Sequence, residues 1–209
     1  MLAEPRLVLA SASPSRARIL RGAGIAFVQR ASDVDEDRLE AGLVGADPAE
    51  LASALARAKA EAVAAELRPS GPARAGALVL GCDSLLVLDG RSHGKPHTES
   101  EATRRWRAQR GRTAELVTGH CLLDRASGAR AEAAISTAVT FAAATDEEIA
   151  DYVASGEPLG VAGAFTLEGR AGPLIERIEG DPSNVLGLSL PGLRRLLAEL
   201  GHNLRDVAG

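Results

Sequence analysis

Short apolar runs alternate with longer stretches of helical periodicity along most of the chain. Runs of adjacent apolar residues are typical of buried strands, whereas apolar positions three or four residues apart are typical of helices that cover a sheet. The pattern predicts strands at 7–10, 26–29, 77–88, 113–123 and 130–141, and helices at 14–21, 48–67, from 98 onward, at 145–153 and at 191–200. We therefore expect an α/β fold in one domain over residues 1–209, because no repeat or long linker divides the chain.

Several predicted helices begin at clear capping signals. Ser13 before Pro14 is typical of an N-cap followed by the first helical turn. Similar signals stand at Asp47 with Pro48, at Thr98 with Glu101 and at Thr145 with Glu148. The stretch 32–42, SDVDEDRLEAG, is polar and acidic, and we interpret it as a loop.

Composition narrows the classes of function. The formal net charge of −4 argues against a binder of nucleic-acid polymers, which needs a basic face, although a few local cations suffice for one phosphorylated ligand. No apolar run approaches the roughly 20 residues of a spanning helix. Nothing at the N-terminus resembles a signal peptide, so we expect a cytoplasmic protein without a membrane partner. Cys82 and Cys121 lie outside any CxxC pair, and we expect both to be reduced core residues.

Lysine is rare among the basic residues. Of 24 Lys and Arg residues, only Lys59 and Lys95 are lysines, and a compact ammonium differs from the planar guanidinium fork. Lys59 follows the apolar Leu55 by four residues in a predicted helix, so its stem is expected to lie along the apolar side. Lys95, in GRSHGKPH, lacks P-loop spacing and is read as a loop lysine. For each lysine the alternative is an incidental or solvated charge.

The junction LVLASASPSRARIL, residues 7–20, combines a strand, a polar turn and a helix N-terminus. Such a junction presents backbone N–H groups and the positive end of a helix dipole. Ser11 and Ser13 add hydroxyl groups, and Arg16 lies in the first helical turn. The arrangement suits a phosphate, and the alternative is an ordinary capped helix.

Asp83 interrupts an apolar strand in VLGCDSLLVL. A carboxylate in such a run is costly unless it is paired, hydrogen-bonded or metal-bound. The alternative is a bulge or strand end that turns Asp83 outward. A functional Asp83 could bind a divalent cation or take a proton from water. The acids of the 32–42 stretch are candidate metal ligands or solvated charges, and their spacing does not match an EF-hand.

Taken in order, a series of short motifs resembles the Maf family, the septum-formation-inhibitor-like nucleotide pyrophosphatases. The motifs are LASASPSR at 9–16, SDVDE at 32–36, LARAKA at 55–60, LGCDS at 80–84, GKP at 94–96, TG at 118–119, YVASGEPLGVAGAF at 152–165, EG at 168–169 and IEGDPSNVLGLSLP at 178–191. The resemblance implies a hydrolase that splits a nucleoside triphosphate into the monophosphate and pyrophosphate with a divalent cation, Mg²⁺ or Mn²⁺. The implied fold is a mixed elongated sheet with helices in two lobes around a central cleft, similar to inosine triphosphate pyrophosphatases.

The resemblance also implies roles for individual residues. Asp83 matches the family's proton acceptor, and Lys59 and Lys95 match catalytic cations. Ser11, Ser13, Arg16 and Glu36 match substrate contacts, and Asp83 and Glu36 are the implied metal ligands. A triphosphate and its leaving pyrophosphate carry several negative charges, which these cations and a metal ion would offset.

Three further positions match sites that select the base: Ser15, Ser84 and Glu168. Relatives similar to enzymes that prefer thymidine and uridine triphosphates have arginine, threonine and glutamine there. This chain departs at all three, and Glu168 looks like the branch that handles 7-methyl-GTP and cytidine or uridine triphosphates. Because a carboxylate accepts hydrogen bonds, we expect cytosine or guanine nucleotides to be preferred over thymidine triphosphate.

The resemblance suggests removal of modified or noncanonical nucleotides, with a link to cell-division arrest. Two alternatives remain at this point. One is a nucleotide-binding regulator of septum formation in which hydrolysis is incidental, and the other is a phosphatase that releases orthophosphate. We take a homodimer as the default oligomeric state.

Overall fold

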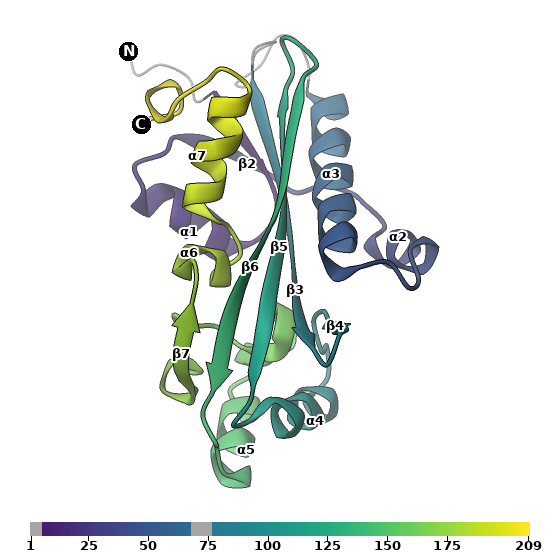
Figure 1. Cartoon of the computed structure of the whole chain (residues 1–209), viewed down its shortest axis with the longest axis vertical. Helices are drawn as coiled ribbons and strands as arrows, with labels where there is room; N and C mark the ends of the chain where they lie inside the picture. The colour runs from purple at the N-terminus through teal and green to yellow at the C-terminus, as the bar shows by residue number, and fades with distance from the viewer. Residues whose placement is uncertain (1–5, 68–76) are drawn as a thin grey trace. The chain divides into compact units, whose positions relative to one another are not determined.

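The structure is a computed structural model that describes residues 6–67 and 77–209. Its strands and α-helices, labelled in Figure 1, are β1 (Leu7–Ala10), α1 (Pro14–Gly22), β2 (Phe27–Arg30), α2 (Glu36–Gly42), α3 (Pro48–Glu66), β3 (Leu78–Leu88), β4 (Arg91–His93), α4 (Glu99–Gln109), β5 (Thr113–Asp124), β6 (Arg130–Phe141), α5 (Asp146–Ala154), β7 (Ile175–Glu179), α6 (Pro182–Val185) and α7 (Leu190–Glu199). Within the described residues, the strands form one sheet in the order β2-β1-β3-β5-β6-β7, with β4 beside β3. The predicted α/β class is confirmed.

The sheet is mixed. β1 pairs in parallel with β2 and β3, whereas β3–β4 and β6–β7 are antiparallel pairs. A turn at Asp89 and Gly90 joins β3 to β4, and both residues have positive φ, 52° and 70°. Two consecutive residues with positive φ give the tight turn whose twist matches a hairpin.

The predicted helix starts are confirmed by their caps. Ser13 caps α1 with Pro14 in the first turn, and Asp47 caps α3 in the same way. Thr145 and Glu148 form a complete capping box at α5. Thr98 caps α4 by accepting a hydrogen bond from the backbone N–H of Glu101, and the Glu101 carboxylate binds arginines of the same helix.

The acidic stretch contains a helix that the sequence reading did not predict. Interpretation of 32–42 as a loop is wrong from Glu36, where α2 begins, and Asp35 caps it by accepting a hydrogen bond from the backbone N–H of Arg38. Acidic residues in the first turn are favourable beside the positive helix end. No residue of α2 is buried, so the helix has no apolar stripe that periodicity could reveal. The short elements β4, β7 and α6 were missed as well.

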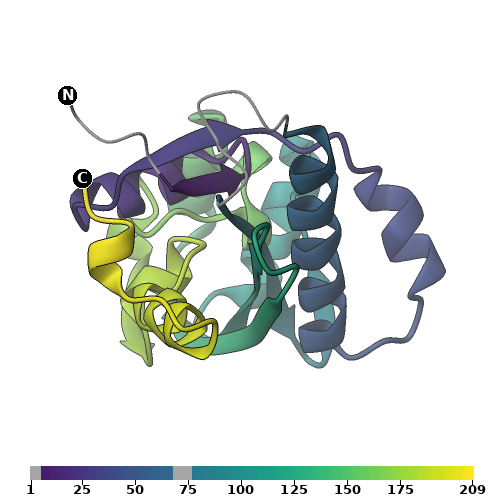
Figure 2. The same cartoon turned by 90° about the horizontal axis from the view of Figure 1, so that it is seen from above.

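The chain divides into two compact units. Unit 1 comprises 1–83, 118–135 and 187–209. In this unit α3 covers one face of the sheet, and α1 and α7 cover the other (Figures 1 and 2). Part of its core, between α3 and the strands, includes Val8, Ala56, Ala60, Val79 and Cys121. Cys82 and Cys121 are both buried and free, as predicted.

Unit 2 comprises 84–117 and 136–186, and its core is aromatic. Trp106 meets Phe141 and Tyr152 edge to face, with ring centroids 5.5 and 5.2 Å apart, and Phe165 meets Phe141 at 5.2 Å. Indole Nε1 of Trp106 donates to the carbonyl oxygen of Ala164 at 2.7 Å. Because these four rings are buried, they do not offer a face for stacking on a base.

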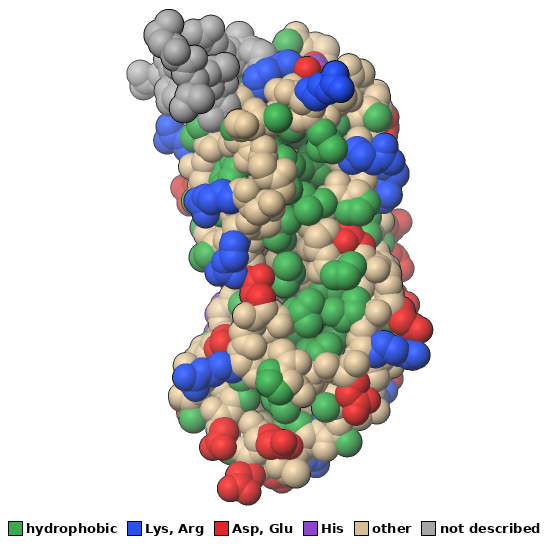
Figure 3. Space-filling view, turned by 90° about the vertical axis from the view of Figure 1, so that its left-hand side faces the viewer, with side chains coloured by type: hydrophobic (Ala, Val, Ile, Leu, Met, Phe, Trp, Pro, Cys, Tyr) green, Lys and Arg blue, Asp and Glu red, His purple; other side chains and the backbone are tan. Residues whose placement is uncertain are grey.

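Exposed charge differs between regions of the surface. Acidic side chains gather at the bottom of Figure 3, where Figure 1 places α5, whose first turn contains Asp146, Glu147 and Glu148. On the face shown there, Lys and Arg side chains are scattered rather than joined in one stripe. Among the described residues, no helix combines the length and apolar character needed to cross a bilayer.

Candidate active site

The strand–turn–helix junction in unit 1 fixes a buried arginine. Arg16 is 9% exposed, and its Nη1 donates to Oγ of Ser11 at 3.0 Å. Its Nε donates to the carbonyl oxygen of Gly187 at 2.7 Å. Ser13 accepts a hydrogen bond from the backbone N–H of Arg16, so it is the helix cap that the sequence predicted. The structure therefore brings these three predicted residues together, and contact with a phosphate stays a prediction.

A second cluster in unit 1 joins an ammonium to two carboxylates. Nζ of Lys59 lies 2.6 Å from Oδ1 of Asp83 and 2.9 Å from Oε2 of Glu36. Lys59 and Asp83 are 6% and 8% exposed, whereas the Glu36 side chain is 41% exposed. Asp83 lies inside β3 and its Oδ1 accepts a hydrogen bond from Lys59, so the alternative of an outward-turned carboxylate is wrong.

Close packing of α3 on the sheet makes this contact possible. A Cβ at Gly81 would lie 2.0 Å from the carbonyl oxygen of Ala56, and a Cβ at Gly119 would lie 2.2 Å from that of Ala52. Only glycine lets the helix backbone approach the strands this closely. Gly81 and Asp83 are two residues apart and therefore face the same side of β3, which puts Asp83 under the α3 residue Lys59.

Glu40 is a carboxylate near this cluster that sequence reasoning missed. Shielding from solvent and the negative charges of Asp83, Asp37 and Glu36 raise the pKa of Glu40, while Lys59 acts in the opposite direction. Glu40 follows Glu36 by four residues, which puts both on one face of α2. A predicted helix at 36–42 would have revealed Glu40, because acidic residues at positions i and i+4 share a face only in a helix.

Asp83 and Glu36 are suitable ligands for a divalent cation. In the part of the chain that the structure describes, no group of three or more His, Cys, Asp and Glu side chains is placed to hold a metal ion. Mg²⁺ is usually held by only one or two carboxylates together with water and substrate phosphates. The two carboxylates that converge on Nζ of Lys59 fit that donor set.

The other predicted residues fall elsewhere. Ser15 lies half-exposed in the first turn of α1, in unit 1. Unit 2 contains Ser84, directly after Asp83 in β3, the exposed Lys95 between β4 and α4, and the exposed Glu168. That these residues meet the unit 1 clusters, and that a cleft lies between two lobes, stays a prediction.

A network in unit 2 holds the turn that carries Glu168. The Glu157 carboxylate accepts hydrogen bonds from the hydroxyl of Thr166 and from the backbone N–H of Arg170, the latter at 2.9 Å. Although burial opposes it, these bonds hold the pKa of Glu157 below its ordinary value. A Cβ at Gly169 would lie 2.4 Å from Oε1 of Glu157. Sequence reasoning quoted Glu157 within a motif but assigned it no role.

Comparisons with known proteins identify the family of the chain. The model of the family described as "Maf-like protein" matches residues 6–200. A protein of Streptomyces coelicolor named nucleoside triphosphate pyrophosphatase is 56% identical over 202 residues, covering 97% of this chain and 94% of that protein. Relatives with the same name in Streptomyces avermitilis and Salinispora tropica are 59% and 57% identical, covering 97% and 93% of this chain and 94% and 84% of theirs.

Proposed function

Because this chain belongs to the Maf family, we propose that it hydrolyses nucleoside triphosphates to the nucleoside monophosphate and pyrophosphate. Proteins of that name match nearly its whole length at more than half identity. The observation that carries the proposal is the contact of the buried Lys59 with the buried Asp83 and the partly exposed Glu36, which joins a cation, a potential base and a potential metal ligand in unit 1.

Asp83 is the proton acceptor in this proposal. The water attacks the α-phosphorus, its proton passes to the carboxylate of Asp83, and the bond to the leaving pyrophosphate breaks. Lys59 holds Asp83 in one orientation through the 2.6 Å contact to Oδ1. Because the Asp83 carboxylate is already oriented, less entropy is lost in placing it during the reaction.

Cations of the chain offset the charge of the triphosphate. Arg16 is pre-oriented by Ser11 and the carbonyl of Gly187, so little rotamer entropy remains to be lost on binding. Ser11, Ser13 and the N-terminus of α1 are further phosphate contacts, and Lys95 is the cation supplied by unit 2. Fixed charges of this kind stabilise the transition state more effectively than solvent does.

Mg²⁺ or Mn²⁺ would be held by Asp83 and Glu36. When bound, such an ion supplies neutralisation of the phosphate oxygens. Glu36 fits this role because it lies at the first turn of α2, within reach of the same ammonium as Asp83. Glu40 adds negative charge beside the two ligands, which favours a cation there.

Base choice is assigned to Ser15, Ser84 and Glu168. Glu168 accepts a hydrogen bond from the exocyclic amino group of cytosine or guanine, including modified forms, and offers nothing to the carbonyl oxygen of thymine. The bonds of Glu157 to Thr166 and Arg170 keep the Glu168 turn in one conformation. Preference for the modified forms of these bases would suit removal of noncanonical nucleotides.

Further parts of the proposal concern the whole protein. Both units act as one Maf-like domain over residues 1–209, as a homodimer in the cytoplasm. The net charge of −4 supports a small-molecule substrate rather than a nucleic-acid polymer.

Product analysis tests the proposal. The purified chain is given Mg²⁺ and dCTP, dGTP, UTP, dTTP or 7-methyl-GTP, and pyrophosphate and orthophosphate are measured separately. We expect one pyrophosphate per monophosphate formed and slower turnover of dTTP. Release of orthophosphate would instead identify a phosphatase. Tight nucleotide binding without turnover of any substrate would favour a nucleotide-binding regulator of septum formation.

A further inference from the structure

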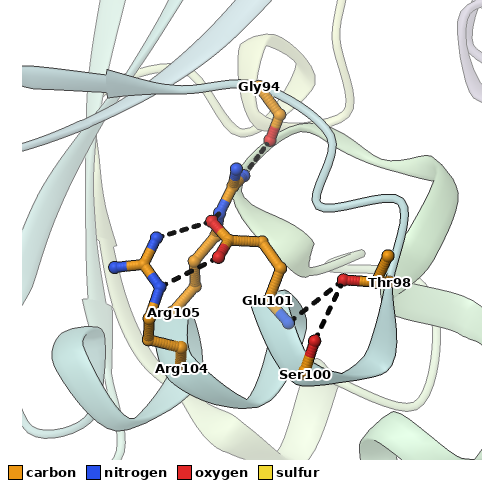
Figure 4. Close-up of polar contacts among 6 residues, drawn as sticks. All are labelled: Gly94, Thr98, Ser100, Glu101, Arg104 and Arg105. Atoms are coloured by element: carbon orange, nitrogen blue, oxygen red, sulfur yellow. Dashed lines mark hydrogen bonds and ion pairs between the residues drawn. The ribbon is translucent and has the colours of Figure 1, made fainter.

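The loop that carries Lys95 is anchored next to that lysine, at the carbonyl group of Gly94. This carbonyl oxygen accepts a hydrogen bond from Nη1 of Arg105 at 2.5 Å and another from the backbone N–H of Gly163 at 3.2 Å. Figure 4 shows the Arg105 guanidinium reaching from α4 to the Gly94 carbonyl. The Lys95 side chain is exposed, so the backbone of the loop determines where its ammonium can reach.

Arg105 is itself held in place. Its Nε donates to Oε1 of Glu101 at 2.6 Å, one turn earlier on α4, and its side chain is only 14% exposed. The bonds from Arg104 and Arg105 lower the pKa of Glu101 to about 2, so this carboxylate is ionised at neutral pH. Because the guanidinium is planar, fixing Nε on Glu101 also fixes the direction of Nη1 toward Gly94.

The second contact to the Gly94 carbonyl comes from Gly163, a position where only glycine fits. Gly163 has a φ of 67°, and a Cβ there would lie 2.7 Å from Cβ of Leu86. The N–H of Gly163 therefore has a defined position against β3. A third contact, from the N–H of His97 to the carbonyl oxygen of Leu159 at 3.2 Å, holds the far side of the loop.

We propose that Arg105, oriented by Glu101, is a positioning residue for Lys95 through the carbonyl group of Gly94. This inference rests on the proposed function, in which Lys95 meets the triphosphate. A lysine side chain has a flexible four-carbon stem, so its ammonium group samples many positions. A fixed backbone at Lys95 limits the volume that the ammonium group can reach. Displacement of a catalytic group by about 1 Å can cost on the order of 100-fold in rate.

Arg104 offers a matched control. It binds the same Glu101, with Nε at 2.9 Å from Oε2 and Nη2 at 2.6 Å from Oε1, but its side chain is 67% exposed. Arg105→Met and Arg104→Met thus remove the same charge and one ion pair of the same carboxylate. We expect Arg105→Met to lower kcat/KM for a nucleoside triphosphate by about 10- to 100-fold, and Arg104→Met to change it less than about twofold.

Coupling to Lys95 separates positioning from loss of structure. In a Lys95→Met background, Arg105→Met is expected to cause no further loss, because the group that it positions is gone. A double variant that loses the product of the two single effects would overturn the proposal. Arg105→Lys, which cannot span both Glu101 and Gly94 with a planar fork, is expected to rescue only poorly.

A second readout needs no activity. The chain has only two lysines, and Lys95 is exposed whereas Lys59 is buried against Asp83, so reductive methylation with ¹³C-formaldehyde labels Lys95 in preference to Lys59 and gives few NMR signals. Titration with pyrophosphate should shift the Lys95 signal in the wild type and in Arg104→Met, and shift it at least about threefold less in Arg105→Met. Equal urea midpoints of the three proteins would show that the variants keep the fold. Equal Lys95 responses in all three proteins would overturn the proposal.

The outcomes distinguish the two levels of inference. A wild-type chain that releases no pyrophosphate rejects the proposed function, whatever the arginine variants do. An active wild type whose Arg105→Met variant matches it in kcat/KM rejects only the positioning role.

Discussion

Replacing Gly81 by alanine tests whether close packing of α3 creates the Lys59–Asp83 contact. The added Cβ would lie 2.0 Å from the carbonyl oxygen of Ala56 and 2.9 Å from the backbone nitrogen of Ala60. Both atoms belong to helix backbone, so neither can rotate away. Since carbon and oxygen need roughly 3.3 Å or more, the helix must retreat from β3 by about 1 Å.

Two effects should follow from this retreat. Overpacking of a dense core costs about 1–3 kcal/mol of unfolding free energy, equivalent to roughly 2–12 °C in Tm for a chain of this size. The same movement takes Nζ of Lys59 from 2.6 Å to beyond hydrogen-bond reach of Oδ1 of Asp83, so pyrophosphate release should fall by about tenfold or more.

Urea unfolding and a pyrophosphate-release assay measure the two effects. Gly22→Ala is the matched control, because no atom lies within 4 Å of a Cβ at that position, and it should leave both quantities nearly unchanged. A Gly81→Ala variant as stable and as active as the wild type would refute the packing argument. Lost stability with full activity would refute only its link to the site.

Arg57 holds the pKa of the Glu132 carboxyl below 4.5 through hydrogen bonds of 2.8 and 2.7 Å. The folded state therefore binds fewer protons than the unfolded state near this pH. The stabilisation that this ion pair gives the folded state is present above about pH 4.5 and is lost as pH falls. Glu132→Gln should therefore flatten the loss of urea stability between neutral pH and about pH 4, and an unchanged slope would contradict this. Glu168→Gln should raise the kcat/KM ratio of dTTP to dCTP by about tenfold, since an amide also donates, and a constant ratio would remove Glu168 from base choice. Chelation with EDTA should abolish pyrophosphate release and added Mg²⁺ should restore it, whereas full activity in EDTA would reject the metal ligands.

Local signals predicted much of the fold. Caps at Ser13, Thr98 and Thr145 lie within three residues of the groups that they bind, so sequence alone could place them. Helix α2 was missed because it lacks a buried face and therefore an apolar periodicity. Its N-cap at Asp35 is the remaining sequence signal, and a single cap is a weaker signal than periodicity.

The site depended more on tertiary structure. Sequence spacing put Arg16 in the first helical turn, but the carbonyl that orients it belongs to Gly187, 171 residues later. Asp83 was recognised by its cost in an apolar strand, and its partner Lys59 is set by the glycine contacts of α3. Arg105 was missed since an i,i+4 acid–base pair usually marks a solvated helix face, and only folding brings Gly94 to it.

Asp83→Asn tests whether Asp83 accepts the proton from the attacking water. Asparagine keeps an oxygen for Lys59 but is not a base, whereas Asp89→Asn makes the same change at an exposed turn whose positive φ suits asparagine. Pyrophosphate release is measured for both variants together with the Kd of the triphosphate. We expect Asp83→Asn to slow release by about 100-fold or more while it still binds nucleotide, and Asp89→Asn to match the wild type. Hydrolysis by Asp83→Asn at the wild-type rate would rule out Asp83 as the proton acceptor.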